Sequence, residues 1–287
     1  IRIEDCTIVG HGGDQQTVGI STKCNAWGWE IVGNTIEGAG TGLYLGNSDG
    51  TMPFVGGLIE GNRVYDPEGY CMEIKHQDTW PTAGSFPTTD QVTVIRNNVW
   101  IKTSRASGSG DRPSVLVGGF PETGAGSGSH YEFYGNLFAE NPRESLLQVC
   151  GRAAIHDNLF VGNADQSAVY LSDHSGHTLK DTWVYSNTIY DVRRGVNFIN
   201  NGSGADQVVG NLIFISSDPS ALGIRNGTPA TQTGNLIDAA SAAGSHVTSP
   251  GHTLGSIDFY PLTGQCQGTA LDLSPFSTHV SYAEDFN

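Results

Sequence analysis

Basic residues are scarce in this sequence. Its 287 residues include 14 lysines and arginines against 29 aspartates and glutamates, which gives a net charge of −15. Proteins that bind nucleic acid rely on basic patches that release counterions from phosphates, so we expect no nucleic-acid partner. An anionic polysaccharide would also need a local cationic site, or bridging Ca²⁺, to overcome the overall negative field.

Several other features are missing as well. No apolar run is long enough to span a membrane, and no segment carries a clear helical period of 3.6 residues. The chain contains no CxxC pair and no histidine spacing typical of a zinc site. An odd number of cysteines argues against a full disulfide framework, although a Cys6–Cys24 bridge stays open. The five are Cys6, Cys24, Cys71, Cys150 and Cys266.

What the chain has instead is a short phrase repeated around an asparagine. The phrase IVGNTI returns as IEGNRV, IRNNVW, FYGNLF and IHDNLF, and then as VYSNTI, VVGNLI and TGNLI. The asparagines are about 22 to 38 residues apart, within the range of solenoid repeats. Around each one the apolar residues lie two apart, which predicts a strand with a turn at the asparagine. The recurring residues are Asn34, Asn62, Asn98, Asn136, Asn158, Asn187, Asn211 and Asn235.

A second short strand follows each phrase, as in GLYLGN, CMEIKHQ, SVLVGG, LLQVCG and AVYLSD. Such a unit cannot bury its apolar side alone, but stacked units about 4.8 Å apart share one interior. A buried asparagine at each bend can then bond to backbone and to the next asparagine. This pattern resembles the right-handed parallel β-helix of the pectate-lyase-like superfamily, without matching any specific family.

The resemblance implies an all-β, single-stranded parallel β-helix (a β-solenoid) with an asparagine ladder. We expect coils over residues 1–240 and a tail over 241–287 that packs on the outside within the same domain, with Phe259, Tyr260 and Leu262 against the coils. Solenoids need capped ends, and residue 1 already lies in a repeat. We therefore expect both termini to continue in the natural gene product.

Alternation assigns the two faces of the second strands. Residues such as Leu43 and Met72 should point inward, whereas Glu73 and its equivalents should form one outward row. The longest inserts flank this row, and long loops on a rigid solenoid commonly build a binding surface. The expected outward residues are Tyr44, Glu73, Leu116, Gln148, Tyr170 and Asn197.

The stretch EIKHQD, residues 73–78, is the densest polar run on any predicted strand. The superfamily resemblance implies a polysaccharide lyase that cleaves a uronate-containing polysaccharide by β-elimination, with a lysine as base and Ca²⁺ as a cofactor. On this hypothesis the catalytic residues are Lys75, His76 and Arg112. The substrate-binding residues are Glu73, Tyr44, Trp80, Arg143, Gln148, Arg152, Tyr170 and His174.

Other interpretations stay open. The charged run can be a solvated strand face, and the protein a non-catalytic secreted or surface solenoid with a structural or glycan-binding role. A uronate epimerase shares the first step of the lyase. A glycoside hydrolase would need two carboxyl groups at a suitable separation, and no such pair stands out on this face. We expect an extracellular monomer that binds a polysaccharide or oligosaccharide.

Overall fold

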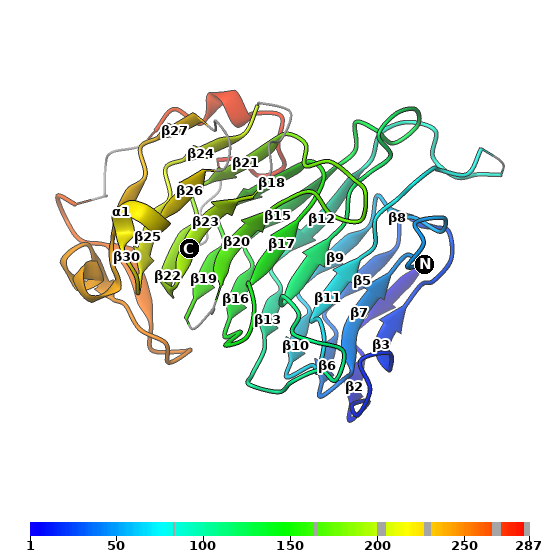
Figure 1. Cartoon of the computed structure of the whole chain (residues 1–287), viewed down its shortest axis with the longest axis horizontal. Coiled ribbons are helices and arrows are strands. Elements are labelled where there is room, and N and C mark those ends of the chain that lie inside the picture. Colours follow the sequence, from blue (N-terminus) through cyan, green and yellow to red (C-terminus); the bar gives the residue numbers. More distant parts are fainter. Residues whose placement is uncertain (83, 163–165, 200–204, 227–230, 266–270, 284–287) are drawn as a thin grey trace.

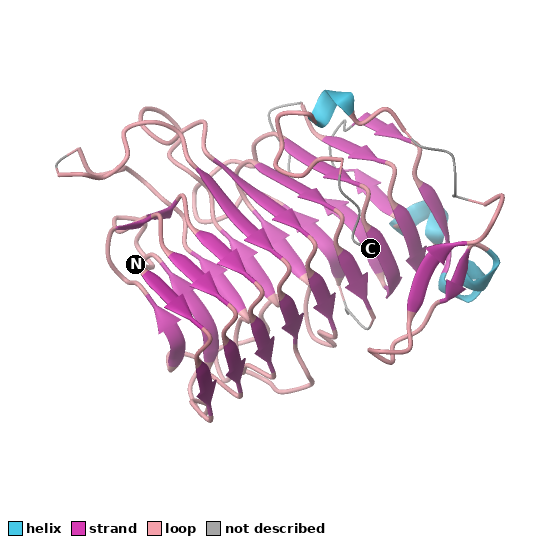
Figure 2. Cartoon of the chain, turned by 180° about the vertical axis from the view of Figure 1, so that it is seen from behind, coloured by secondary structure: helices cyan, strands magenta, loops and turns pink. Residues whose placement is uncertain are grey.

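The computed structural model is a stack of parallel coils in which each repeat contributes three short strands (Figure 1). The structure describes all residues except 83, 163–165, 200–204, 227–230, 266–270 and 284–287. The turn at each asparagine separates the residues before it and after it into two different sheets, so one predicted strand becomes two. Figure 2 shows the three resulting sheets as the faces of one elongated body. The predicted parallel β-helix is confirmed.

Strands that precede the asparagines form the first sheet, and those that follow them form the second. The first sheet contains β1 (Arg2–Glu4), β5 (Glu30–Val32), β9 (Leu58–Glu60), β12 (Val92–Arg96), β15 (His130–Tyr134), β18 (Ala153–His156), β21 (Thr182–Tyr185), β24 (Gln207–Val209) and β27 (Thr231–Thr233). The second contains β2 (Thr7–Val9), β6 (Thr35–Glu37), β10 (Arg63–Tyr65), β13 (Val99–Ile101), β16 (Leu137–Ala139), β19 (Leu159–Val161), β22 (Thr188–Val192), β25 (Leu212–Ile215) and β28 (Leu236–Ala239).

The third sheet carries the predicted functional face. Its strands are β3 (Val18–Ser21), β7 (Thr41–Leu45), β11 (Met72–Ile74), β14 (Val115–Val117), β17 (Leu147–Val149), β20 (Ser167–Leu171), β23 (Arg194–Phe198) and β26 (Ile224–Asn226). The smaller elements are β4 (Ala26–Trp27) paired with β8 (Phe54–Val55), helix α1 (Pro219–Leu222), and 3₁₀ turns η1 (Ala240–Ser245) and η2 (Ser274–Phe276). No helix in the described part of the chain has the length and apolarity that a membrane span requires.

The asparagine ladder explains the repeated phrase. The Oδ1 atom of Asn136 accepts bonds from the backbone N–H and the Nδ2 of Asn98, both at 3.0 Å, and Asn136 donates in the same way to Asn158. The pattern runs without a break from Asn34 to Asn235. The amides from Asn34 to Asn211 are buried and hydrogen-bonded, which fixes the corner of each coil.

The residue before each ladder asparagine has a left-handed backbone, with φ between 50° and 66°. Such a conformation costs little only for glycine, and next for asparagine and aspartate. Glycine occupies five of these eight places and Asn97 and Asp157 occupy two more, so seven follow this rule and Ser186 is the exception. The glycines are Gly33, Gly61, Gly135, Gly210 and Gly234. In the GN dipeptide the glycine therefore forms the turn and the asparagine forms the ladder.

The interior is one continuous apolar core that runs through the coils. Side chains stack from coil to coil, as Phe138 does on Phe160 with ring centroids 4.7 Å apart. All the second-strand residues predicted to point inward are buried, with at most 1% of their surface exposed. The assignment of the inward face is therefore confirmed. They are Leu43, Leu45, Met72, Ile74, Val115, Val117, Leu147, Val149, Val169, Leu171, Val196 and Phe198.

The described residues beyond 240 lie against the C-terminal half of the coils, from the last coil back to β15 (Figure 1). Strands β29 (Val247–Ser249) and β30 (Asp258–Pro261) form an antiparallel pair. Phe259 packs with Tyr190, and Phe276 stacks on Tyr185 at 4.1 Å between ring centroids. The expectation that Tyr260 packs inward is wrong, because its side chain alternates to the solvent side of β30 and is 51% exposed.

Candidate functional site

The outward residues of the third sheet lie in one straight row. Backbone pairing places Tyr44 beside Glu73, Glu73 beside Leu116, and Leu116 beside Gln148. Gln148 then pairs with Tyr170, and Tyr170 with Asn197. Neighbours in such a row are about 4.8 Å apart. The predicted row is therefore present, and two pockets open along it.

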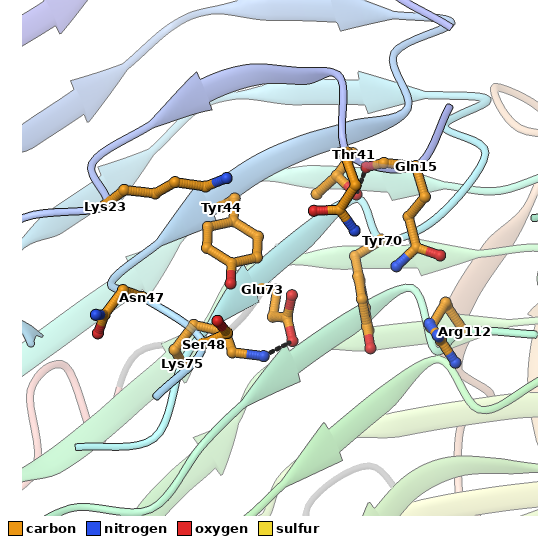
Figure 3. Close-up of a pocket in the computed structure, with 11 residues that line it drawn as sticks. Gln15, Lys23, Thr41, Tyr44, Asn47, Ser48, Tyr70, Glu73, Lys75 and Arg112 are labelled. Atoms are coloured by element: carbon orange, nitrogen blue, oxygen red, sulfur yellow. Dashed lines mark hydrogen bonds and ion pairs between the residues drawn. The ribbon is translucent and has the colours of Figure 1, made fainter. Parts of the chain in front are cut away.

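The first pocket, called the basic pocket below, has a volume of about 390 Å³ and lies over β3, β7 and β11 (Figure 3). Side chains from the N-terminal coils and from the loops after β7 and before β14 surround it. Polar groups dominate its lining, which suits a hydrated ligand better than an apolar one. It is lined by Gln15, Gln16, Lys23, Thr41, Tyr44, Asn47, Ser48, Tyr70, Glu73, Lys75 and Arg112.

An ion pair lies in the floor of the basic pocket. Glu73 and Lys75 are two residues apart on one strand, so both point to the same side. Lys75 Nζ donates to Glu73 Oε1 at 2.8 Å, and the side chains are only 16% and 6% exposed. Burial removes much of the water that would stabilise the two charges. Each of the two charges is therefore stabilised mainly by the other. A ligand that entered the pocket would contact the pair directly.

The lining carries three cations and one carboxylate, although the whole chain is strongly acidic. Lys23 Nζ and Lys75 Nζ lie 5.1 Å and 5.6 Å from the centre of the Tyr44 ring. Burial, the largest cause, raises the pKa of Tyr44, while the Lys75 charge opposes that shift. The tyrosine is therefore neutral, and the pocket presents positive charge to an incoming anion.

Arg112 is held at the rim by its own loop. Its Nη2 donates to the carbonyl of Ser109 at 2.8 Å, and its Nη1 to the carbonyl of Asp111 at 3.2 Å. The guanidinium also lies over the Tyr70 ring at 5.8 Å. Its Nε is buried and has no hydrogen-bond partner among the described residues. These contacts orient the cation without neutralising it, which leaves it suited to bind a carboxylate.

A second pocket of about 390 Å³ lies two strands further along the row from Glu73. Gln148, Tyr170 and His174 contribute to it, as the sequence predicted for a binding face. Its charge differs from that of the basic pocket, since it has two carboxylates and no lysine or arginine. It is lined by Glu144, Gln148, Gln166, Tyr170, Ser172, Asp173 and His174.

Trp80 is buried and lines neither pocket, which contradicts its expected place among the substrate-binding residues. The side chain is 3% exposed and packs with Val55 and Phe86 in a small cluster of its own. Its indole N–H donates to Gln77 Oε1 at 2.7 Å. The ring therefore fastens the 76–91 insert to the coils. The inserts over 76–91 and 118–130, which flank the outward row in the sequence, also do not line the basic pocket.

Arg143 and Arg152 line neither pocket. Arg143 donates to the carbonyl of Ser104 and pairs with Asp111 at 3.2 Å. Arg152 pairs with Asp181 at 3.2 Å. Of the three arginines predicted near Lys75, the structure brings only Arg112 into the pocket. Each of the other two is committed to a neighbouring loop.

Lys23, Gln15 and Tyr70 were missed by the sequence analysis. The repeat could have indicated Lys23. Ser21 pairs with Tyr44, and Tyr44 with Glu73, so the residues two positions further along, Lys23, Gly46 and Lys75, are equivalent in their coils. Gln15 comes from an irregular loop before β3, for which the repeat gives no position. His76 also lies outside the basic pocket and turns instead toward Asp78 and His177.

Comparisons with known proteins agree with the architecture. A family model described as a right-handed β-helix region matches residues 18–213, which is more than half of the chain. No curated protein and no solved structure matches the chain significantly.

Proposed function

The chain belongs to the right-handed β-helix family, and on that premise we propose that it is a polysaccharide lyase that cleaves a uronate-containing polysaccharide in the basic pocket. The supporting observation is the charge of that pocket, where Lys23, Lys75 and Arg112 surround one carboxylate in a chain of net charge −15. A local cationic site of this kind is what an acidic sugar needs against the overall field.

The proposed reaction removes the proton on C5 of a uronate, which is α to its carboxylate. As a base takes that proton, a C4=C5 double bond forms and the C4–O bond to the neighbouring sugar breaks. Cations beside the carboxylate stabilise the charge that develops on it. Arg112 and Lys23 fill this role, because both line the pocket and Lys23 makes no salt bridge within the described residues.

Lys75 is the proposed base. Its ammonium already donates to Glu73, and transfer of that proton leaves a neutral amine beside a neutral carboxylic acid. The amine then takes the C5 proton. The departing O4 takes a proton from the hydroxyl of Tyr44, which burial keeps protonated, and the proton held by Glu73 then returns to Tyr44 and restores the resting charges.

Calcium does not fit the basic pocket. Ca²⁺ takes six to eight oxygen ligands, several of them carboxylates. Of the eleven lining residues only Glu73 carries a carboxylate, and it is engaged by Lys75. The same shortage argues against a glycoside hydrolase, which uses two carboxyl groups. We therefore assign the charge-neutralising role to arginine and lysine. An enzyme for a polymeric sugar also implies an extracellular location.

A glycan-binding solenoid without catalysis is the second candidate. The observation in its favour is the Lys75–Glu73 pair itself, because an ion-paired ammonium is not a base until it loses its proton. Incubation with a panel of uronate polysaccharides separates the two. Elimination gives an ultraviolet-absorbing unsaturated product that is lighter by one water than the hydrolysis product. Binding without any such product would favour the solenoid, and altered uronate stereochemistry without cleavage would favour an epimerase.

Replacement of Arg112 by glutamine should raise KM for an acidic oligosaccharide by about tenfold to a hundredfold, since a hydrogen bond to a charged group contributes roughly 1.5–3 kcal/mol. Lys23→Gln should act in the same direction, and both effects should shrink at high salt. Steady-state kinetics at two ionic strengths make the measurement. Arg143→Gln is the matched control, because Arg143 is bound to Asp111 outside the pocket. Equal KM values for the three variants would contradict the assignment.

A further inference from the structure

A cluster of three potential metal ligands lies next to the basic pocket. His76 and Asp78 follow β11 directly, and His177 lies 99 residues after Asp78 in the chain. One ligand atom from each lies within 4.8 Å of the other two. His177 is buried, His76 is partly buried and the Asp78 side chain is 52% exposed. The cluster therefore has a fixed inner side and an open outer side.

The hydrogen bonds of His177 indicate that the cluster is arranged to bind a cation. Its Nδ1 lies 3.1 Å from the carbonyl oxygen of Phe120, which can only accept, so Nδ1 carries the hydrogen. In a neutral imidazole Nε2 is then unprotonated, yet it faces Asp78 Oδ1 at 3.0 Å. Two acceptors at that distance repel each other unless a proton or a metal cation lies between them. A backbone carbonyl on the far nitrogen is also the usual way a metal-binding histidine is oriented.

His76 is the third potential ligand, and its ring lies beside that of His177. The His76 and His177 rings have centroids 5.1 Å apart. Ligand atoms on a tetrahedral zinc are roughly 3.3 Å apart, so a small rotation of His76 closes the site around the existing Asp78–His177 contact.

The backbone around the cluster is rigid and closely packed. His174 and His177 exchange two backbone hydrogen bonds, of 3.1 and 3.0 Å, across Ser175 and Gly176. Both turn residues have positive φ, as in tight two-residue hairpins. A Cβ on Gly119 would lie 2.4 Å from the Cβ of His177, so only glycine permits this approach.

The other two ligands are held in a similar way. The N–H of Asp78 donates to the carbonyl of Gly50 at 3.0 Å, and the N–H of Gln77 to the carbonyl of Gly119 at 2.9 Å. A Cβ on Gly50 would lie 2.8 Å from Cδ2 of His76 and 2.9 Å from Cγ of Asp78. Two segments far apart in sequence are thus locked together with their three donor atoms converging.

We propose that His76, Asp78 and His177 form a binding site for one divalent transition-metal ion of the zinc type. Two imidazoles and one carboxylate match the ligand preference of Zn²⁺, Co²⁺ or Ni²⁺ and not that of Ca²⁺ or Mg²⁺, which favour oxygen. Three protein ligands leave a fourth position for water on the exposed side of Asp78. The site does not depend on the lyase reaction, because none of its ligands lines the basic pocket.

The test is metal binding by the full chain after removal of metal with a chelator. Zn²⁺ is titrated in competition with a chromophoric chelator, and Co²⁺ is titrated while its visible absorption is followed. We expect one ion per chain and a tetrahedral Co²⁺ spectrum. His76→Gln, Asp78→Asn and His177→Gln should each weaken Zn²⁺ binding by at least about 100-fold, since even loss of a residue that only orients a ligand costs 10- to 100-fold.

His252→Gln is the matched control. His252 Nε2 pairs with Asp191 Oδ2 at 2.6 Å, a histidine–aspartate contact outside the cluster, so this variant should bind as the parent does. Asp78→Asn changes an exposed side chain and should fold normally, which keeps the test decisive if His177→Gln is unstable. Failure of the parent to bind an ion stoichiometrically would overturn the proposal. Unchanged affinity in Asp78→Asn and His76→Gln would overturn it equally.

Discussion

Replacing Lys75 with methionine should lower kcat for uronate cleavage by about 10³-fold, within the 10²- to 10⁴-fold range of general-base catalysis. The variant should also be less stable, because it leaves the Glu73 carboxylate buried at 6% exposure without its partner. Loss of one member of a buried pair costs about 3–5 kcal/mol. Turnover on an acidic polysaccharide and thermal unfolding are the two measurements.

A double variant separates catalysis from stability. Glu73→Gln combined with Lys75→Met removes both charges and leaves no buried ion unpaired, so most of the lost stability should return. Activity should stay as low as in the single variant, because the base is still absent. Recovery of turnover together with stability would show that Lys75 serves the fold and not the reaction.

Replacing Asn136 with alanine should destabilise the protein by about 4 kcal/mol or more. Asn136 Oδ1 accepts two bonds from Asn98, and its Nδ2 donates to the carbonyls of Ile95 and Tyr134. The residue is fully buried, so these groups lose their partners out of reach of water. Each orphaned buried group costs about 1–3 kcal/mol. Chemical denaturation of parent and variant measures the loss.

Cys6→Ala is the control for the ladder. Cys6 occupies the ladder position of the first coil, but it bonds to Asn34 Oδ1 through its backbone N–H, which alanine retains. The side chain is exposed, so Cys6 shares the backbone bond of the ladder without packing into the core. The change should alter stability by less than about 0.5 kcal/mol, as surface substitutions do. Similar losses in Cys6→Ala and Asn136→Ala would contradict the claim that ladder amides hold the coils.

The coils could be predicted because local chemistry and the stacked fold demand the same residues. The turn before Asn34 needs a left-handed residue and has Gly33, and the strands on either side bury every second side chain. Tyr260 shows where this reasoning stops. The tail has no repeat, so its contacts depend on how β30 meets the coils, and the apolar character of a side chain does not decide which way it faces.

Those parts of the candidate site that lie on the repeated strands could be predicted in the same way. Glu73 and Lys75 share a face because they are two apart on a strand, and the structure pairs them. Trp80 lies in an irregular insert, where periodicity does not predict the direction of a side chain. It is buried against Phe86, with the two ring centroids 5.5 Å apart. His177 meets Asp78 across 99 residues, so no local spacing of histidines could reveal that cluster.

Cysteine chemistry adds nothing to the account of the site. Cys6, Cys24, Cys71 and Cys150 are free thiols, so the Cys6–Cys24 bridge left open by the sequence is not formed. Burial raises the pKa of the Cys71 and Cys150 thiols to about 12, which makes them packing residues and not nucleophiles. Cys266 lies outside the described residues.

The central claim is that the basic pocket binds a uronate with its carboxylate toward the pocket cations. A crystal structure of the Glu73→Gln, Lys75→Met double variant with an acidic oligosaccharide tests it most directly, since that protein should bind without cleaving. The account predicts a uronate in the pocket, with its carboxylate within hydrogen-bonding distance of Arg112 or Lys23 and its C5 over residue 75. An oligosaccharide bound elsewhere on the coils, with an empty basic pocket, would contradict it.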